Sequence, residues 1–254
     1  MGFTELLRRG LAAGAAAGLA AAIVLYLVVE PVIRKALVIE EARGAEAGDG
    51  HSHTHAADEA EPLVSRTMQV IGGMGTALVV GCLFGIAFAV VFARVRHRIP
   101  AASEHGRAVT LAALAFLVFS LMPALKIPSN PPAVGDPDTV NRRTLIYVLT
   151  ILVALALVLA VFALDQALAA RGLSGATRST LDVLAFAVGA VALFAVLPGT
   201  PDSVPHDVPA ALIWEFRLAS LAQLATMWAT LGLAFGLLVT PRVREAREVE
   251  VVTA

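Results

Sequence analysis

Six long apolar stretches constrain the fold of this chain more than any other feature. A helix that crosses a bilayer core of about 30 Å needs roughly 20 mostly apolar residues. Six segments meet that need: residues 10–29, 70–93, 108–125, 145–164, 181–198 and 218–240. Apolar residues make up 58% of the 254 residues and charged residues 15%, against roughly half and a quarter in soluble domains. The sequence therefore predicts an all-α, polytopic transmembrane helix bundle, with residues 1–254 forming a single integral membrane domain.

The first and fifth apolar stretches each allow an alternative to a transmembrane span. The fifth is short and carries Asp182 in its first turn, so a five-span chain, in which residues 181–198 only dip into the membrane, stays open. The first follows Arg8 and Arg9, as a signal peptide would, but its apolar run exceeds the usual 7 to 15 residues of such a segment. We expect the first span to be retained.

Residues 30–69 form the predicted connection between the first two spans, and they begin with an amphipathic segment. Apolar and charged residues alternate with helical spacing: Val32, Ile33, Ala36, Leu37 and Ile39 against Arg34, Lys35, Glu40 and Glu41. Pro31 suits the first turn of a helix. The pattern predicts a short helix lying in the membrane interface.

Two local patterns bear on helix packing. Glycines recur every fourth residue at Gly10, Gly14 and Gly18, and pairs with the same spacing are Gly81/Gly85 and Gly232/Gly236. Small residues at this period let helices approach closely in lipid, which predicts tight packing within the bundle or, as the sharper alternative, a docked partner helix. The pair Met122-Pro123 predicts a break near the end of the third span.

The distribution of charge predicts the orientation of the chain. With the N-terminus inside, eleven of the nineteen Lys and Arg residues fall on the inner face, together with seven of the twenty Asp and Glu residues. Positive loops favour the cytoplasmic side, so both termini, including the polar tail 241–254, are expected in the cytoplasm and the chain in the cytoplasmic membrane. The predicted outer face has an excess of carboxylates, which would raise the local concentration of cations.

The stretch GDGHSHTHAADEAE, residues 48–61, holds three of the six histidines. His51, His53 and His55 would project to one side of an extended segment, and imidazole is the commonest ligand of Co, Ni, Cu and Zn ions. The competing interpretation is a polar linker with no metal role. Further candidate ligands are Glu40 and Glu41 beside the triplet, and His206 and Asp207 in a later loop.

Two proline-rich segments, residues 126–144 and 199–217, are predicted as further outer loops, and the prolines are expected to keep helix out of the first of them.

The chain has one cysteine and lacks the P-loop, the G-x-S-x-G turn and the H-E-x-x-H helix, which disfavours an enzyme. No basic stripe is present that would bind nucleic acid.

Several of these motifs together resemble the CbtA family, a proposed cobalt transporter subunit. They are Glu30-Pro31, Glu40-Glu41 leading into the His-rich loop, LVSR before the second span, KIPSNPPAVGDPDT, and WEFRLAS at the last span. The resemblance covers nearly the whole chain. It implies a bacterial membrane protein that imports cobalt for cobalamin synthesis with CbtB, a small single-span, histidine-bearing companion. Five spans are usual for the family, against six here. Motif residues to which no role is assigned are Glu30, Lys126, Asn130, Asp136, Arg143, Trp214 and Arg217.

The leading hypothesis is divalent metal transport, with cobalt as the favoured ion and capture by the outer histidines and carboxylates. Nickel and zinc are alternative substrates. Such a site cannot select cobalt by affinity, because nickel and copper bind the same ligands more tightly, so cobalt specificity would have to come from elsewhere. No permanently bound cofactor is expected. The alternative is a non-transporting accessory that captures metal for a separate permease.

Overall fold

The fold is all-helical in the part of the chain that the computed structural model describes, residues 2–48 and 64–240. Six helical segments in that part are long and apolar enough to cross a membrane: Phe3–Gly44, Arg66–Arg98, Glu104–Lys126, Pro137–Ala170, Gly175–Val196 and Ala210–Val239. The predicted helix bundle with six spans is thereby confirmed. The fifth segment reaches 22 residues, which favours six spans over five.

The chain divides into two compact units, and each is described separately. Unit one comprises residues 1–116 and 218–254, and unit two comprises residues 117–217. Within the described residues, unit one contains α1 (Phe3–Val24), α2 (Glu30–Gly48), α3 (Arg66–Val95), α4 (Glu104–Phe116) and most of α8 (Ala210–Val239). Unit two contains α5 (Met122–Lys126), α6 (Val140–Ala170), α7 (Gly175–Val196) and the first residues of α8.

The predicted helix after the first span is present as α2, and it follows α1 without a break. A π-helical turn, Leu25–Val29, joins the two. Val32 and Ala36 are buried on one face of α2, whereas Arg34 and Glu40 on the other are exposed. This is the amphipathic face that the sequence pattern indicates.

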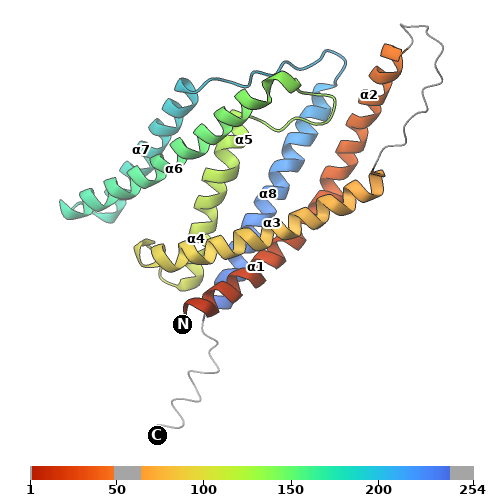
Figure 1. The fold of residues 1–254 in the computed structure, drawn as a ribbon. Coiled ribbons are helices and arrows are strands. Elements are labelled where there is room, and N and C mark those ends of the chain that lie inside the picture. Colours follow the sequence, from red (N-terminus) through yellow and green to blue (C-terminus); the bar gives the residue numbers. More distant parts are fainter. Residues whose placement is uncertain (1, 49–63, 241–254) are drawn as a thin grey trace. The chain divides into compact units, whose positions relative to one another are not determined.

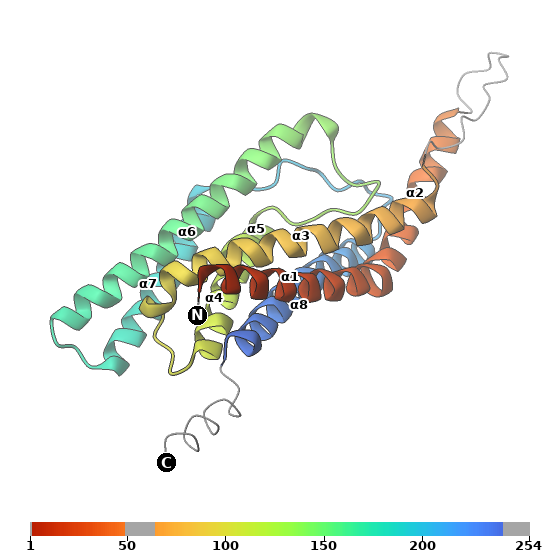
Figure 2. The same cartoon turned by 60° about the horizontal axis from the view of Figure 1, so that its bottom comes forward.

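The glycines of α1 and α3 bring these two helices into backbone contact in unit one, where they lie side by side (Figures 1 and 2). A Cβ atom built on Gly10 would lie 2.5 Å from the carbonyl oxygen of Gly85, and one on Gly81 would lie 2.5 Å from the Cα of Gly18. Side chains cannot fit at such distances. The glycine period therefore serves packing within the bundle, and the face proposed as an alternative dock for a partner helix is already covered by the chain's own helix.

Aromatic side chains of α3 and α8 complete the core of unit one. The ring of Phe235 makes edge contacts with Phe88 and Phe92 at centroid distances of 5.2 and 5.1 Å. Gly232 and Gly236 let α8 approach α4 at Ala112 and His105. Edge-on aromatic pairs add stabilisation beyond the burial of their surface.

The predicted break at Met122-Pro123 is wrong, because the chain stays helical up to Lys126. A π-helical turn, Leu117–Leu121, comes directly before Met122. Proline lacks an N–H and its ring clashes with the carbonyl four residues earlier, here that of Phe119, and a wider turn relieves that clash. The Phe119 carbonyl accepts a hydrogen bond from the Tyr147 hydroxyl at 3.4 Å. Pro31 likewise stands two residues after a π-helical turn.

The prolines of the two predicted outer loops also begin helices. A 3₁₀ turn at Pro137–Thr139 leads into α6 at Val140, and Pro209 immediately precedes α8. Proline is favoured in the first turn, where its missing N–H would have no partner anyway. The expectation of a helix-free segment is therefore wrong for residues 140–144, and Trp214 and Arg217 lie on α8.

The contact between α1 and α3 gives a first prediction. Gly81→Ala places a methyl group against the backbone of Gly18, and overpacking of this kind costs about 1–3 kcal/mol. We expect a lower unfolding temperature for the detergent-solubilised protein. Gly75→Ala on the same helix is the matched control, because nothing lies within 4 Å of a Cβ there; its unfolding temperature should be unchanged or higher. Equal unfolding temperatures of the two variants would contradict the proposed packing role of Gly81.

Candidate functional site

The predicted metal ligands are not assembled into a site within the described residues. Over residues 2–48 and 64–240, no group of three or more His, Cys, Asp or Glu side chains is close enough to hold an ion. Glu40 and Glu41 are exposed on α2, and His206 and Asp207 are exposed between α7 and α8. His51, His53 and His55 lie outside the described residues, so their role remains a prediction.

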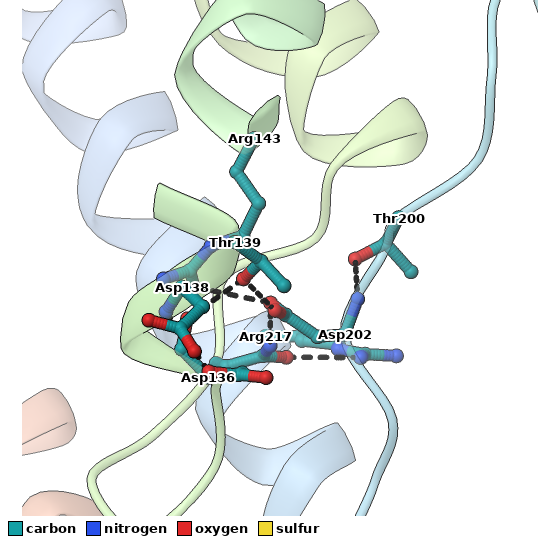
Figure 3. Close-up of polar contacts among 8 residues, drawn as sticks. Asp136, Asp138, Thr139, Arg143, Thr200, Asp202 and Arg217 are labelled. Atoms are coloured by element: carbon teal, nitrogen blue, oxygen red, sulfur yellow. Dashed lines mark hydrogen bonds and ion pairs between the residues drawn. The ribbon is translucent and has the colours of Figure 1, made fainter. Parts of the chain in front are cut away.

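Unit two instead contains a polar cluster centred on a buried carboxylate that joins two connections between helices (Figure 3). We call Asn130, Thr139, Arg143, Asp202 and Arg217 the Asp202 network. Asn130 and Thr139 belong to the α5–α6 connection (residues 127–139), Asp202 belongs to the α7–α8 connection (residues 197–209), and Arg143 and Arg217 lie on α6 and α8. The network therefore holds segments that are more than 60 residues apart along the chain.

Asp202 accepts hydrogen bonds on both of its carboxylate oxygens. Oδ1 accepts from the Thr139 hydroxyl at 2.5 Å, and Oδ2 accepts from the Asn130 amide at 3.1 Å. Nη1 of Arg143 lies 3.0 Å from Oδ2, and the Asp202 side chain is only 2% exposed. A charge at this depth is tolerated because it is paired and hydrogen-bonded.

Local turns place the donors around Asp202. The Asp136 carboxylate accepts from the Asp138 N–H at 2.9 Å, and the Thr139 hydroxyl also donates to the Asp136 carbonyl at 2.7 Å. Gly135 has φ of +129°, and a Cβ there would stand 3.2 Å from Nη1 of Arg143. The backbone conformation therefore favours glycine, and a Cβ atom would also crowd the guanidinium group.

The two arginines carry more hydrogen-bonding capacity than the network uses. Nη2 of Arg217 donates to the Asn130 side-chain oxygen at 3.2 Å. The Nε atoms of Arg143 and Arg217 are buried without a hydrogen-bond partner. Arg143 also lies in the first turn of α6, where the helix dipole disfavours positive charge. Its ion pair with Asp202 offsets that repulsion.

Lys126 and Trp214, two further motif residues, lie apart from these contacts. Nζ of Lys126 donates to the Phe194 carbonyl at 2.9 Å and stands 5.9 Å from the centre of the Phe194 ring. Phe194 is in the last turn of α7, where a cation is favoured by the helix dipole. The Trp214 side chain is exposed.

Glu30 is the centre of a second cluster, in unit one. This residue is 5% exposed and pairs with Arg34 at 2.9 Å and with Arg66 at 2.5 Å. Arg66 opens α3 directly after Ser65, whose hydroxyl caps the helix by accepting from the Met68 N–H. The Glu30 contacts therefore fix the start of α3 to the point where α2 begins.

Sequence reasoning selected most members of these clusters as motif residues, but it missed Asp202 as the centre of one. The available signal was indirect. Arg143 and Arg217 both follow proline-rich segments near the start of an apolar helix, where a positive charge needs a carboxylate partner. Nothing in the local sequence shows that this partner would come from the TPD stretch, residues 200–202.

The fold defines a multi-pass membrane protein. The chain belongs to the CbtA family, because the family model described as "Probable cobalt transporter subunit (CbtA)" matches residues 3–240. The family description also implies assembly with another subunit. Neither the curated proteins nor the solved structures include a match to the chain.

The Glu30 cluster gives a second prediction. Glu30→Gln removes the charge that pairs with two arginines, and because both arginines are partly exposed we expect a loss of about 1–3 kcal/mol. The unfolding temperature in detergent should fall, with increased proteolysis between α2 and α3. Glu40→Gln is the control, since Glu40 is exposed on the same helix. A Glu30 variant as stable as the control would show that this ion-pair cluster contributes nothing.

Proposed function

We propose that this protein carries out cobalt uptake across the cytoplasmic membrane as the multi-span subunit of a transporter. The observation that carries the proposal is the family match, which covers residues 3–240 and includes all six candidate spans. The motif residues in both units support it, because their contacts give the chain fixed helix ends. A membrane subunit that binds and releases an ion needs such a scaffold.

Ion capture is assigned to the histidine triplet of the connection between α2 and α3. Three neutral imidazoles at alternate positions, with Asp49 and Asp58 nearby, provide nitrogen and oxygen ligands suited to Co²⁺. The excess of carboxylates on the predicted outer face favours a high local concentration of cations. Glu40, Glu41, His206 and Asp207 are second-rank candidates for receiving the ion.

Selection of cobalt is assigned to the assembled transporter, because these ligands bind nickel and copper at least as well. A small single-span companion with its own histidine, of the CbtB kind, is the expected partner. The chain's own part is collection of the ion and formation of the membrane path, with no enzymatic step. In the alternative, the chain collects the ion but a separate permease moves it.

The capture step gives a third prediction. Replacing His51, His53 and His55 together by Gln should raise the cobalt concentration for half-maximal uptake several-fold, because three ligands are lost. The maximal rate should change little. Uptake of radioactive Co²⁺ by cells measures both quantities. His97→Gln is the control, because that residue lies in the 3₁₀ turn that follows α3, on the predicted inner face.

Two experiments test the proposed function and its alternative. Cells that lack the whole gene and still take up cobalt like the wild type would contradict the proposed function. Vesicles containing the purified chain, with and without the companion subunit, separate transport from capture: flux of Co²⁺ supports a transporter, whereas binding without flux in both preparations supports the accessory role.

A further inference from the structure

We propose that Asp202 is a positioning residue for transport: it holds the α5–α6 and α7–α8 connections together through Thr139 and Asn130, it pairs with Arg143 at the start of α6, and it does not bind the transported ion. The inference rests on the proposed transport function and adds to it a role for a residue to which no role had been assigned. Its basis is the set of contacts within the Asp202 network of unit two.

The first step is that the Asp202 carboxylate is already fully engaged. One oxygen accepts from Thr139, and the other accepts from Asn130 and lies 3.0 Å from Arg143. The side chain is 2% exposed. A metal ion would have to displace a guanidinium and two other donors to bind here, which would leave a buried positive charge without its partner.

The second step is that Arg143 and Arg217 depend on the Asp202 carboxylate more than the carboxylate depends on either arginine. Arg143 forms an ion pair with Asp202, and its Nε atom is buried and unpartnered. Arg217 donates to the Asn130 side chain, which is itself held by Asp202. Loss of the Asp202 charge would therefore release Arg143 directly and Arg217 indirectly.

The third step concerns what this release would do to the chain. Without Asp202, the positive charge of Arg143 faces the N-terminal end of the α6 dipole with no compensation. The favourable response is for Arg143 to turn towards solvent, out of the space beside Gly135. The hydrogen bonds of Thr139 and Asn130 to residue 202 would then be weaker, so the α5–α6 connection would be held less firmly to the α7–α8 connection, and the starts of α6 and α8 would be coupled less tightly.

The experiment compares Asp202→Asn with the charge-exchanged double variant Arg143→Asp/Asp202→Arg. Asp138→Asn is the matched control, since Asp138 is an exposed residue of the same connection and contributes its backbone N–H, rather than its carboxylate, to the hydrogen bond with Asp136. Cobalt uptake is measured per amount of folded protein in the membrane. Hydrogen exchange of residues 127–139 in the purified protein gives a measurement that does not depend on transport.

We expect Asp202→Asn to lower the maximal uptake rate about tenfold, since a charged buried hydrogen bond is lost, with little change in the half-saturating cobalt concentration. Exchange in residues 127–139 should become faster. The double variant should recover most of the rate, because an aspartate suits the first turn of α6. This recovery is the decisive result, since position 202 then carries no metal ligand.

Three results would overturn the inference: a raised half-saturating concentration with an unchanged maximal rate, unchanged exchange in residues 127–139, or no recovery in the double variant. If Asp202→Asn does not fold, Thr139→Val removes a single donor and should give the same changes at smaller size. If the wild-type protein gives no cobalt uptake, the proposed function fails, and the exchange measurement still tests whether Asp202 joins the connections.

Discussion

The constraint on which the rest of this structure depends is that a backbone in lipid must satisfy its own hydrogen bonds. An unpaired N–H or C=O in the hydrocarbon region costs several kcal/mol, so the chain remains helical even where its sequence would end a helix in water. Pro31 and Pro123 each follow a π-helical turn, and the Phe119 carbonyl accepts from Tyr147. The backbone contact of α1 with α3 answers a second demand of lipid: apolar helices have no hydrophobic reason to associate there, so close van der Waals packing at small residues holds them together.

Both units use a buried carboxylate to fix the start of a helix that has an arginine in its first turn. Glu30 holds Arg66 at the start of α3, and Asp202 holds Arg143 at the start of α6. An arginine is unfavourable at this end of a helix, and a carboxylate is unfavourable when buried alone. Pairing therefore removes the unfavourable free energy that the arginine and the carboxylate would each have alone. The arrangement therefore specifies which segment must lie beside which helix, and this specificity does not require a large net gain in stability.

The fold was largely predictable from the sequence. The length of each apolar stretch predicts a transmembrane helix, the four-residue spacing of the glycines predicts close helix packing, and both can be recognised within a short stretch of sequence. The continuity of the helix at Pro123 was not predictable, since the Phe119 carbonyl that the proline leaves free is bonded by the hydroxyl of Tyr147, a residue on another helix. The Asp202 network was only half predictable. Its arginines are recognisable beside apolar helices, but the carboxylate lies 63 residues from Thr139 and 72 from Asn130, and no local pattern pairs them.

A polar motif in a transport protein is usually taken first as a set of ligands, and the contacts here support a different interpretation. Glu30 is held by two arginines, Lys126 donates to a helix end, and Asn130 and Arg143 are held by Asp202. A side chain saturated by protein partners can bind an ion only by giving up those contacts. These motif residues are therefore best understood as groups that fix helix ends, which is why the proposed capture of the ion is assigned to other histidines and carboxylates. Under that proposal the motif residues with arginine, lysine and helix-end partners define the scaffold, and the histidines define its chemistry.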